Sequence, residues 1–285
     1  MKRNLSFWTS LLLLAGPLTA SASLIDGLHA YWDFEGDANN HALAAGGAAF
    51  NGTLLGGATT AGTPVIAGSG ALLLDGVDNY MNVASSVNVN QPWSVSAWYW
   101  SEVAPATTAR GFVYEGVGSY AMSFGIREGS PTTQTGHQLF LQRTGGDLSQ
   151  TFNLSDAATV NNWHHILSVF TPSTASTDGA LIGYLDGQER YSLTIPANST
   201  HPAATGFNVG TYRSANGRWF QGAIDEVAIW TRSLSLEEAQ SAYTLGQSGQ
   251  PLSSVPEAST SALVCLGLLF AGRRAARFRA PSPCR

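Results

Sequence analysis

The sequence is poor in cysteine. It has two cysteines in 285 residues, Cys265 and Cys284, and both lie near the C-terminus. The body of the chain therefore cannot form a disulfide framework, a thiolate metal site or a cysteine nucleophile. About 225 residues without disulfides have to be held by one sizeable hydrophobic core, which is feasible for a single domain of this length.

Basic residues are scarce in the body of the chain. Of the 14 lysines and arginines, two lie at the N-terminus and five in the last 13 residues, so residues 24–254 carry 7 basic and 18 acidic side chains. The net charge of this part is −11, whereas that of the whole chain is −5. A strongly acidic body attracts cations and gives no reason to expect nucleic-acid binding.

The apolar run at the N-terminus is too short to cross a membrane. It extends from Phe7 to Leu18, whereas a span needs about 20 apolar residues. Lys2 and Arg3 precede it, and the small residues Ala20-Ser21-Ala22 follow it. This pattern predicts a secretory signal peptide at residues 1–22, exported by the Sec translocon and cut after Ala22; a retained membrane anchor is the alternative.

Helical patterns are almost absent from the body, where short apolar runs alternate with Gly, Asn, Ser and Pro. Such patterns predict an all-β sandwich in one domain, residues 24–247, followed by a linker at residues 248–254. Asp186-Gly187 between two apolar runs predicts a hairpin with a type I′ turn. The expected strands lie at residues 24–34, 70–83 (two strands), 94–100, 112–115, 121–127, 138–143, 163–170, 181–195 (the hairpin), 207–211 and 222–230.

The last expected strand, residues 222–230, is apolar on both faces and should therefore be central in the sandwich. It contains two adjacent carboxylates, Asp225 and Glu226. Adjacent strand residues point to opposite sides, so we expect Glu226 to pair with an arginine such as Arg213 or Arg232.

A short helix follows this strand. Ser235 as N-cap and Glu238 three residues later form a capping box. Leu236, Ala239 and Tyr243 are its expected buried stripe, and Gly246 its end.

Several segments together carry a resemblance to a known family. They are LHAYWDFEGDANNH, NGTLLGGA, GALLLDGVDNYMNV, WSVSAWYW, WHHILSV, LIGYLDGQ, FNVGT and GAIDEVAIWTRSLSLEEAQSAY, in this order. The set resembles the LamG-like jelly-roll domains of the concanavalin A-like lectin and glucanase superfamily. The resemblance covers nearly the whole body and implies a concanavalin A-like jelly-roll sandwich of two antiparallel sheets.

The resemblance also implies a structural calcium ion. In such jelly rolls a carboxylate of the last strand often binds calcium together with carbonyl groups of the first strand and an early turn. Asp225 is the matching carboxylate, with Asp33 and the turn at Asp75-Gly76 as its expected neighbours. Calcium takes six to eight oxygen ligands, which these groups can supply in part. The alternative is that Asp225 caps backbone N–H groups and that the other residues only form turns.

Catalytic patterns are missing. Related laminarinase-type enzymes carry Glu-x-Asp-x-x-Glu on one strand, and no such spacing occurs here. A Gly-x-Ser-x-Gly elbow is also absent. His164 and His165 are strand neighbours and cannot share a metal, so we expect no enzyme.

A glycan site is the better-supported expectation, because sugars stack on Trp or Tyr and bond to polar side chains. The candidate residues lie in two loops and are Trp219, Tyr212, Arg213, Asn216 and Tyr120. Trp32, Trp98, Trp163 and Trp230 fall in strands and are expected in the core.

The C-terminus resembles the PEP-CTERM sorting signal of Gram-negative bacteria. Val255-Pro256-Glu257 precedes an apolar run at residues 262–272, and an arginine cluster that begins with Arg273 and Arg274 follows it. Ala258 stands where the family has its second proline. The resemblance, over residues 255–279, implies a transient transmembrane segment and cleavage by an exosortase-type protease; an ordinary membrane anchor is the alternative.

These features together predict an exported protein of the outer surface or extracellular matrix of a Gram-negative bacterium. Its expected partner is an exopolysaccharide or cell-surface glycan, in a biofilm matrix. A purely structural matrix protein is the first alternative, and a polysaccharide-degrading enzyme is disfavoured.

Overall fold

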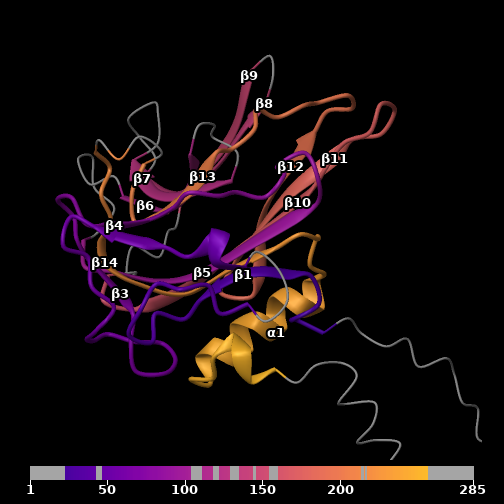
Figure 1. Cartoon of the computed structure of the whole chain (residues 1–285). Coiled ribbons are helices and arrows are strands. Elements are labelled where there is room, and N and C mark those ends of the chain that lie inside the picture. Colours follow the sequence, from indigo (N-terminus) through magenta and orange to yellow (C-terminus); the bar gives the residue numbers. More distant parts are fainter. Residues whose placement is uncertain are drawn as a thin grey trace, which may run out of the picture.

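The computed structural model describes residues 23–42, 47–103, 111–117, 122–128, 135–143, 146–153, 160–212, 215 and 217–255. Two seven-stranded antiparallel sheets lie face to face, and one α-helix covers the outside of one of them (Figure 1). The expected all-β sandwich with one helix near the end of the domain is confirmed.

The first sheet contains the strand that the sequence placed at residues 222–230. Its order is β1 (Leu28–Trp32), β14 (Gln221–Trp230), β5 (Trp93–Ser101), β10 (Trp163–Thr171), β11 (Gly179–Leu185) and β12 (Gln188–Ile195). The short strand β3 (Leu72–Asp75) pairs with the beginning of β14, and β1 pairs with its end. Both β14 and β5 are central, as their two-sided apolar patterns predict.

The second sheet has the order β2 (Thr53–Leu55), β4 (Tyr80–Val83), β13 (Gly206–Val209), β6 (Gly111–Val117), β7 (Ser123–Glu128), β8 (Thr135–Arg143) and β9 (Gly146–Asn153). The sequence predicted neither β2 nor β9 as a strand. The hairpin between β11 and β12 turns at Asp186 and Gly187, whose φ angles are 52° and 72°, as a type I′ turn requires.

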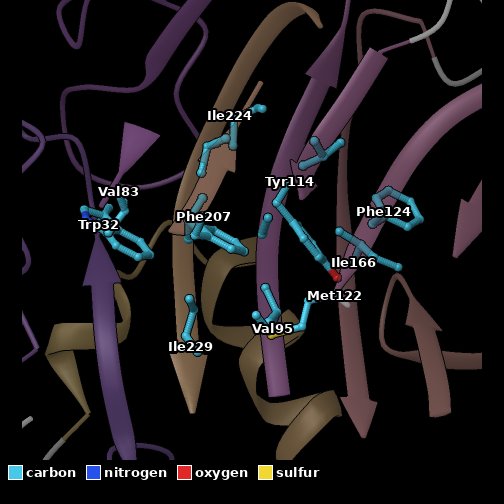
Figure 2. Packing of buried hydrophobic residues seen from close by; sticks show 14 of the residues in the cluster. Trp32, Val83, Val95, Tyr114, Met122, Phe124, Ile166, Phe207, Ile224 and Ile229 are labelled. Carbon is cyan, nitrogen blue, oxygen red and sulfur yellow. The ribbon is translucent and has the colours of Figure 1, made fainter. Parts of the chain in front are cut away.

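The main core lies between the two sheets (Figure 2). Trp32 of β1 stacks on Phe207 of β13, with ring centroids 6.0 Å apart. Tyr114 of β6 crosses the core and bonds to Ser168 of β10 at 2.7 Å. Each fully buried large side chain of this kind stabilises the fold by about 1.5–3 kcal/mol. The core therefore supplies the stability that disulfides do not.

A second apolar cluster lies on the outside of the first sheet, beneath α1 (Leu236–Gln247) and the short 3₁₀ helix η2 (Leu252–Ser254). Ala239 and Ala242 of α1 and Leu252 of η2 pack on Trp230. The other 3₁₀ helix, η1 (Gly47–Phe50), lies between β1 and β2 in the chain. The outer face of the first sheet is thus largely covered.

The capping box of α1 is confirmed, because Ser235 accepts from Glu238 N–H and the Glu238 carboxylate accepts from Ser235 N–H. The expected buried stripe is wrong at Leu236, which is 42% exposed. Gly246 does not end the helix. It lies inside the helix against Trp98, where a Cβ would approach the ring to 2.5 Å.

Of the tryptophans expected in the core, Trp32, Trp98 and Trp230 are buried. Trp163 is half-buried at the start of β10 and meets Trp100 edge to face. No helix in the described part of the chain combines the length and apolar character that a membrane crossing requires. The apolar run at residues 262–272 lies outside the described residues.

Candidate functional site

A row of polar side chains crosses the outer face of the second sheet. The register places its members directly opposite one another on neighbouring strands, in the order Thr53, Asn82, Asn208, Glu115 and Ser123. Directly paired residues share a face and lie about 5 Å apart. We call these five residues the polar row.

Hydrogen bonds order part of this row. Asn82 Nδ2 donates to Asn208 Oδ1 at 2.8 Å, and Asn208 Nδ2 donates to the carbonyl of Tyr212 at 3.1 Å. No described residue donates to the amide oxygen of Asn82, which is half-buried. An oriented amide with a free acceptor is suited to a sugar hydroxyl.

Aromatic side chains and one arginine gather along one side of the polar row, next to its middle members on β4, β13 and β6. Tyr80, which shares a face with Asn82, contacts Trp219 with ring centroids 5.7 Å apart. Beside this pair, the guanidinium carbon of Arg218 lies 4.3 Å above the ring of Tyr212, whose ring centroid is 5.7 Å from that of Phe112. We call these five residues the Trp219 cluster.

The backbone that carries the cluster is held by the sheet. Phe112 N–H donates to the carbonyl of Arg218 at 3.2 Å, and Phe220 N–H donates to the carbonyl of Gly210 at 2.8 Å. Arg218 has a φ of 58° and Gly217 one of 138°. These two residues turn the loop so that consecutive side chains contact different aromatic partners.

The structure thus brings together two of the predicted glycan-binding residues, Trp219 and Tyr212. The other three, Tyr120, Arg213 and Asn216, lie outside the described residues. Sequence reasoning missed Tyr80, Phe112 and Arg218. The alternation in the segment NYMNV was the available signal, because Met81 and Val83 face the core and the residues between and before them face outward.

The carboxylates of β14 form a separate site on the first sheet. The register between β14 and β5 shifts between Asp225 and Ala228, and Glu226 has a φ of 51°. This is a β-bulge, in which two residues occupy the place of one. Ile224 before the pair and Val227 after it both belong to the main core, so the two carboxylates both lie on the outer side of the strand.

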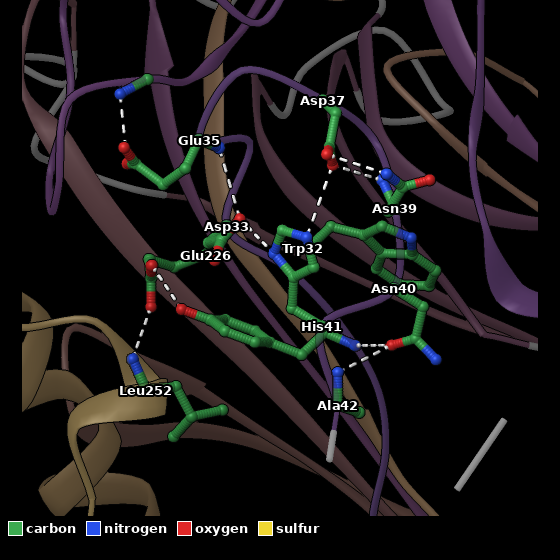
Figure 3. A network of polar contacts seen from close by, with 12 residues as sticks. Trp32, Asp33, Glu35, Asp37, Asn39, Asn40, His41, Ala42, Glu226 and Leu252 are labelled. Carbon is green, nitrogen blue, oxygen red and sulfur yellow. Dashed lines mark hydrogen bonds and ion pairs between the residues drawn. The ribbon is translucent and has the colours of Figure 1, made fainter. Parts of the chain in front are cut away.

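The bulge overturns the expectation that Glu226 is a surface partner of an arginine. Glu226 is only 7% exposed and accepts from the Tyr31 hydroxyl at 2.7 Å and from Leu252 N–H at 2.8 Å (Figure 3). Arg232 instead bonds to Glu238 at 2.6 Å. Burial raises the pKa of Glu226 to about 7, although these hydrogen bonds oppose the shift.

Asp225 is fully buried beside Glu226. Its carboxylate accepts from Ile66 N–H at 3.2 Å and from the N–H of Glu226 at 2.8 Å. Burial, and next the charge of Glu226, raise the pKa of Asp225 to about 8. A buried carboxylate of this kind is stabilised in its charged form by a bound cation.

The other predicted calcium ligands lie at different distances from Asp225. Asp33 directly follows β1, and its charge acts on Glu226, while its own carboxylate bonds to His41 Nδ1 at 2.7 Å (Figure 3). Asp75 and Gly76 do not converge on Asp225. Asp75 pairs with Gln221, four residues earlier in β14, which corresponds to about 13 Å, and its carboxylate accepts from Val77 N–H at 2.8 Å.

Within the described residues, no three His, Cys, Asp or Glu side chains are grouped so that they could hold a metal. An ion at Asp225 would therefore need backbone carbonyls and water as further ligands, and calcium accepts both.

Comparison with known proteins agrees with the fold. A family model for the concanavalin A-like lectin/glucanases superfamily matches residues 75–240, more than half of the chain. This match spans β14, most of both sheets and the Trp219 cluster. No curated protein sequence matches the chain.

Solved structures of similar fold include domains that bind sugars. Domain 4 of an extracellular arabinanase from Geobacillus stearothermophilus, in complex with arabinotriose, has 18% identity and a TM-score of 0.54, over 75% of this chain and 97% of that domain. The botulinum neurotoxin serotype D binding domain has 13% identity and a TM-score of 0.59, over 77% of this chain and 52% of that one.

A second neurotoxin structure, the serotype D ligand binding domain in complex with N-acetylneuraminic acid, has 13% identity and a TM-score of 0.57, over 77% of this chain and 51% of that one. The chain thus spans about half the length of the neurotoxin domains. At these identities the similarity is one of fold.

Proposed function

Because the chain belongs to the concanavalin A-like lectin/glucanases superfamily, we propose that it is a non-catalytic carbohydrate-binding protein. Its ligand, an exopolysaccharide or cell-surface glycan, lies on the outer face of the second sheet. The observation that carries the proposal is the Trp219 cluster beside the polar row. That similar domains are known in complex with arabinotriose and N-acetylneuraminic acid supports it.

The arrangement provides both elements of sugar recognition. A pyranose or furanose presents C–H groups on one face and hydroxyls around its edge. The Tyr80–Trp219 pair supplies an aromatic surface for the C–H face. The half-buried amide of Asn82, which the buried Asn208 holds in place, supplies an acceptor for a hydroxyl. A site on a regular sheet is also largely preformed, so little conformational entropy is lost on binding.

The same face is poorly equipped for glycoside hydrolysis. Hydrolysis requires two carboxyl groups about 5–10 Å apart across the scissile bond. Among the described members of the polar row and the Trp219 cluster, Glu115 is the one carboxylate, and it is fully buried. Asp225 and Glu226 are buried beneath η2 and the segment at Ile66 on the other sheet. The geometry therefore favours binding.

Binding can be tested on a glycan array followed by titration with the best polysaccharide. Substitution Trp219→Ala removes half of the aromatic pair, and we expect a dissociation constant at least about tenfold higher, because aromatic contacts contribute about 1 kcal/mol beyond their buried area. Trp163→Ala is the matched control, since Trp163 is also half-buried and also contacts one other ring, that of Trp100 at 6.0 Å.

An equal loss in both variants would point to general destabilisation. A lack of binding to all polysaccharides would support a purely structural matrix protein, and turnover of any of them would show an enzyme.

We further propose that Asp225 binds a structural calcium ion. The donor chemistry fits, because a fully buried carboxylate with a raised pKa gains from a hard cation. The body's net charge of −11 favours cation uptake. When bound, the ion would neutralise charge where β14, the end of β1 and the segment at Ile66 meet.

Thermal unfolding with calcium and with a chelator tests this proposal. At 100 to 1,000 times the dissociation constant, calcium should stabilise the fold by about 3–4 kcal/mol, which raises the melting temperature by about 10 °C. Asp225→Asn keeps the shape and should lose the calcium effect. Asp75→Asn, a carboxylate about 13 Å away, should keep it. An identical melting temperature with calcium and chelator would exclude the site.

The setting that we propose is the outer surface or extracellular matrix of a Gram-negative bacterium. Residues 1–22 would direct export through the Sec translocon, and residues 255–279 would act as a PEP-CTERM signal for an exosortase-type protease. Val255 is the last described residue, while Pro256, Glu257, Arg273 and Arg274 lie outside the described part. Mass spectrometry of the protein from its own cells would show whether both ends are removed.

A further inference from the structure

We infer that the site on the second sheet is specific for anionic saccharides and that Arg218 contacts the negative group. This inference rests on the proposed carbohydrate-binding function and names the class of ligand. The relevant ligand chemistry is a sugar ring that carries a carboxylate or a sulfate ester.

The first observation is the position of the Arg218 side chain. Its guanidinium carbon lies 4.3 Å from the ring centroid of Tyr212 and 5.8 Å from that of Phe112. Two aromatic rings thus hold the charged group on the outer face of the sheet. A guanidinium above a ring keeps the N–H donors along its edge available for a planar anion.

The second observation is that this charge lacks a carboxylate partner within the described residues. The side chain of Arg218 takes part in no ion pair and no hydrogen bond there. By contrast, Arg232 bonds to both oxygens of Glu238 and to two backbone carbonyls. Within the described residues, the side chain of Arg218 is thus held by aromatic rings and not by a carboxylate.

The third observation is the surroundings of Arg218. The next residue, Trp219, contacts Tyr80, so the aromatic pair and the guanidinium are carried by consecutive positions of one loop, whose Cα atoms are about 3.8 Å apart. A saccharide unit is several ångströms across. One sugar ring on the Tyr80–Trp219 pair can therefore place its exocyclic negative group at Arg218.

Glu115, the carboxylate on this face, forms no ion pair with the guanidinium of Arg218. Glu115 lies two register positions from Phe112 in β6, across a β-bulge, which corresponds to about 7 Å along the strand, and it is fully buried. The position that combines ring stacking with charge attraction is therefore the Trp219 cluster, at Arg218 and Trp219.

The test compares polysaccharides of different charge on the full-length protein. Polygalacturonate and alginate supply carboxylates, carrageenan supplies sulfate esters, and arabinan and dextran are neutral. We expect tighter binding of the anionic set, with an affinity that falls as salt rises from 50 to 500 mM. The preference between carboxylate and sulfate identifies which negative group the site accepts.

Three variants test whether the charge of Arg218 itself is responsible for the binding of anionic polysaccharides. Arg218→Gln should weaken anionic binding by about tenfold to a hundredfold and leave neutral binding nearly unchanged. Arg218→Lys keeps the charge without the planar fork and should give an intermediate loss. Arg190→Gln removes an equal charge from an exposed position in β12 of the first sheet and should change nothing.

Melting temperatures of the three variants provide the control for folding. Binding of neutral and anionic polysaccharides with equal affinity, unchanged by Arg218→Gln, would overturn this inference and leave the carbohydrate-binding function intact. Binding of none of them would overturn both. An equal loss in Arg190→Gln would show that the protein's overall charge, and not a site at Arg218, governs the interaction.

Discussion

His165 shows how its position in the fold sets the chemistry of one side chain. The ring lies beneath α1, with centroids 5.0 Å from Trp98 and 6.1 Å from Tyr243. Its Nε2 is 2.7 Å from the hydroxyl of Ser96. Burial lowers the pKa of His165 to about 4, and the charge of Asp186 opposes this shift only in part. The histidine is therefore neutral in the folded protein at pH 5–8.

This pKa predicts a pH dependence of stability. Between the ordinary histidine value of about 6.5 and about 4, the unfolded chain binds a proton that the folded protein does not. The contribution of neutral His165 to the free energy of unfolding is thus fully present above pH 6.5 and is lost as pH falls toward 4. His165→Gln cannot titrate, so the stability difference between the natural protein and this variant should shrink by about 3 kcal/mol from pH 7 to pH 4.

Urea denaturation at several pH values measures this difference. Only the difference between the two proteins is informative, because Asp225 and Glu226 have raised pKa values and make stability fall as pH rises through the range from about 4 to about 8. Glutamine can still bond to Ser96, so the comparison isolates the titration. A difference that stays constant from pH 7 to pH 4 would contradict the burial of His165.

The sequence predicted burial correctly for residues whose orientation follows from the alternation of side chains along a strand. Trp32 and Trp230 were assigned to the core, and they are 0% and 1% exposed. Glu226 was misplaced because a β-bulge shifts the alternation at that point, and its φ of 51° is a property of the folded backbone. Nothing in the letters DEV marks such a bulge, since glutamate rarely adopts a positive φ.

At the scale of secondary-structure elements, apolar patterns located most strands, and turn residues located the hairpin. The missed strand β9 has the sequence GDLSQTFN, which is polar and has no clear alternation. It lies at the edge of the second sheet and pairs with β8 alone. Edge strands are often short of apolar residues, so their formation depends on a neighbour that local sequence does not reveal.

The helix α1 illustrates a second limit. Its cap follows from the local spacing of Ser235 and Glu238, and the prediction is confirmed. Which residues of α1 are buried depends on the shape of the outer surface of the first sheet. Trp98 projects from that surface, so small residues, Ala239, Ala242 and Gly246, face the sheet, and the larger Leu236 is left outside. A buried stripe defined by large apolar residues alone cannot anticipate this fit.

At the scale of the whole molecule, the two ends of the described chain meet on the first sheet. Trp230 Nε1 donates to the carbonyl of Leu24 at 2.6 Å, and the guanidinium of Arg232 reaches the carbonyls of Ser23 and Asp26. The other end closes over the same strand, since Leu252 N–H donates to Glu226. The sandwich is thereby fastened around β14.

The closure of the chain over β14 predicts that η2, the 3₁₀ helix after α1, is part of the folded domain. A variant that ends at Gln250 lacks Leu252, whose side chain is 6% exposed, and deprives Glu226 of a hydrogen-bond donor. The lost apolar burial costs about 2 kcal/mol, and the lost bond about 1 kcal/mol. Compared with a variant that ends at Val255, we expect unfolding to be easier by about 3 kcal/mol in urea.

Leu252→Ala in the chain that ends at Val255 separates the two contributions, because it removes the side chain and keeps the N–H group that donates to Glu226. It should account for about 2 kcal/mol of the loss. Equal urea midpoints for the chains that end at Gln250 and Val255 would show that η2 adds nothing to the domain. Since η2 covers the first sheet and the Trp219 cluster lies on the second, both shortened chains should bind polysaccharide equally well at temperatures where they remain folded.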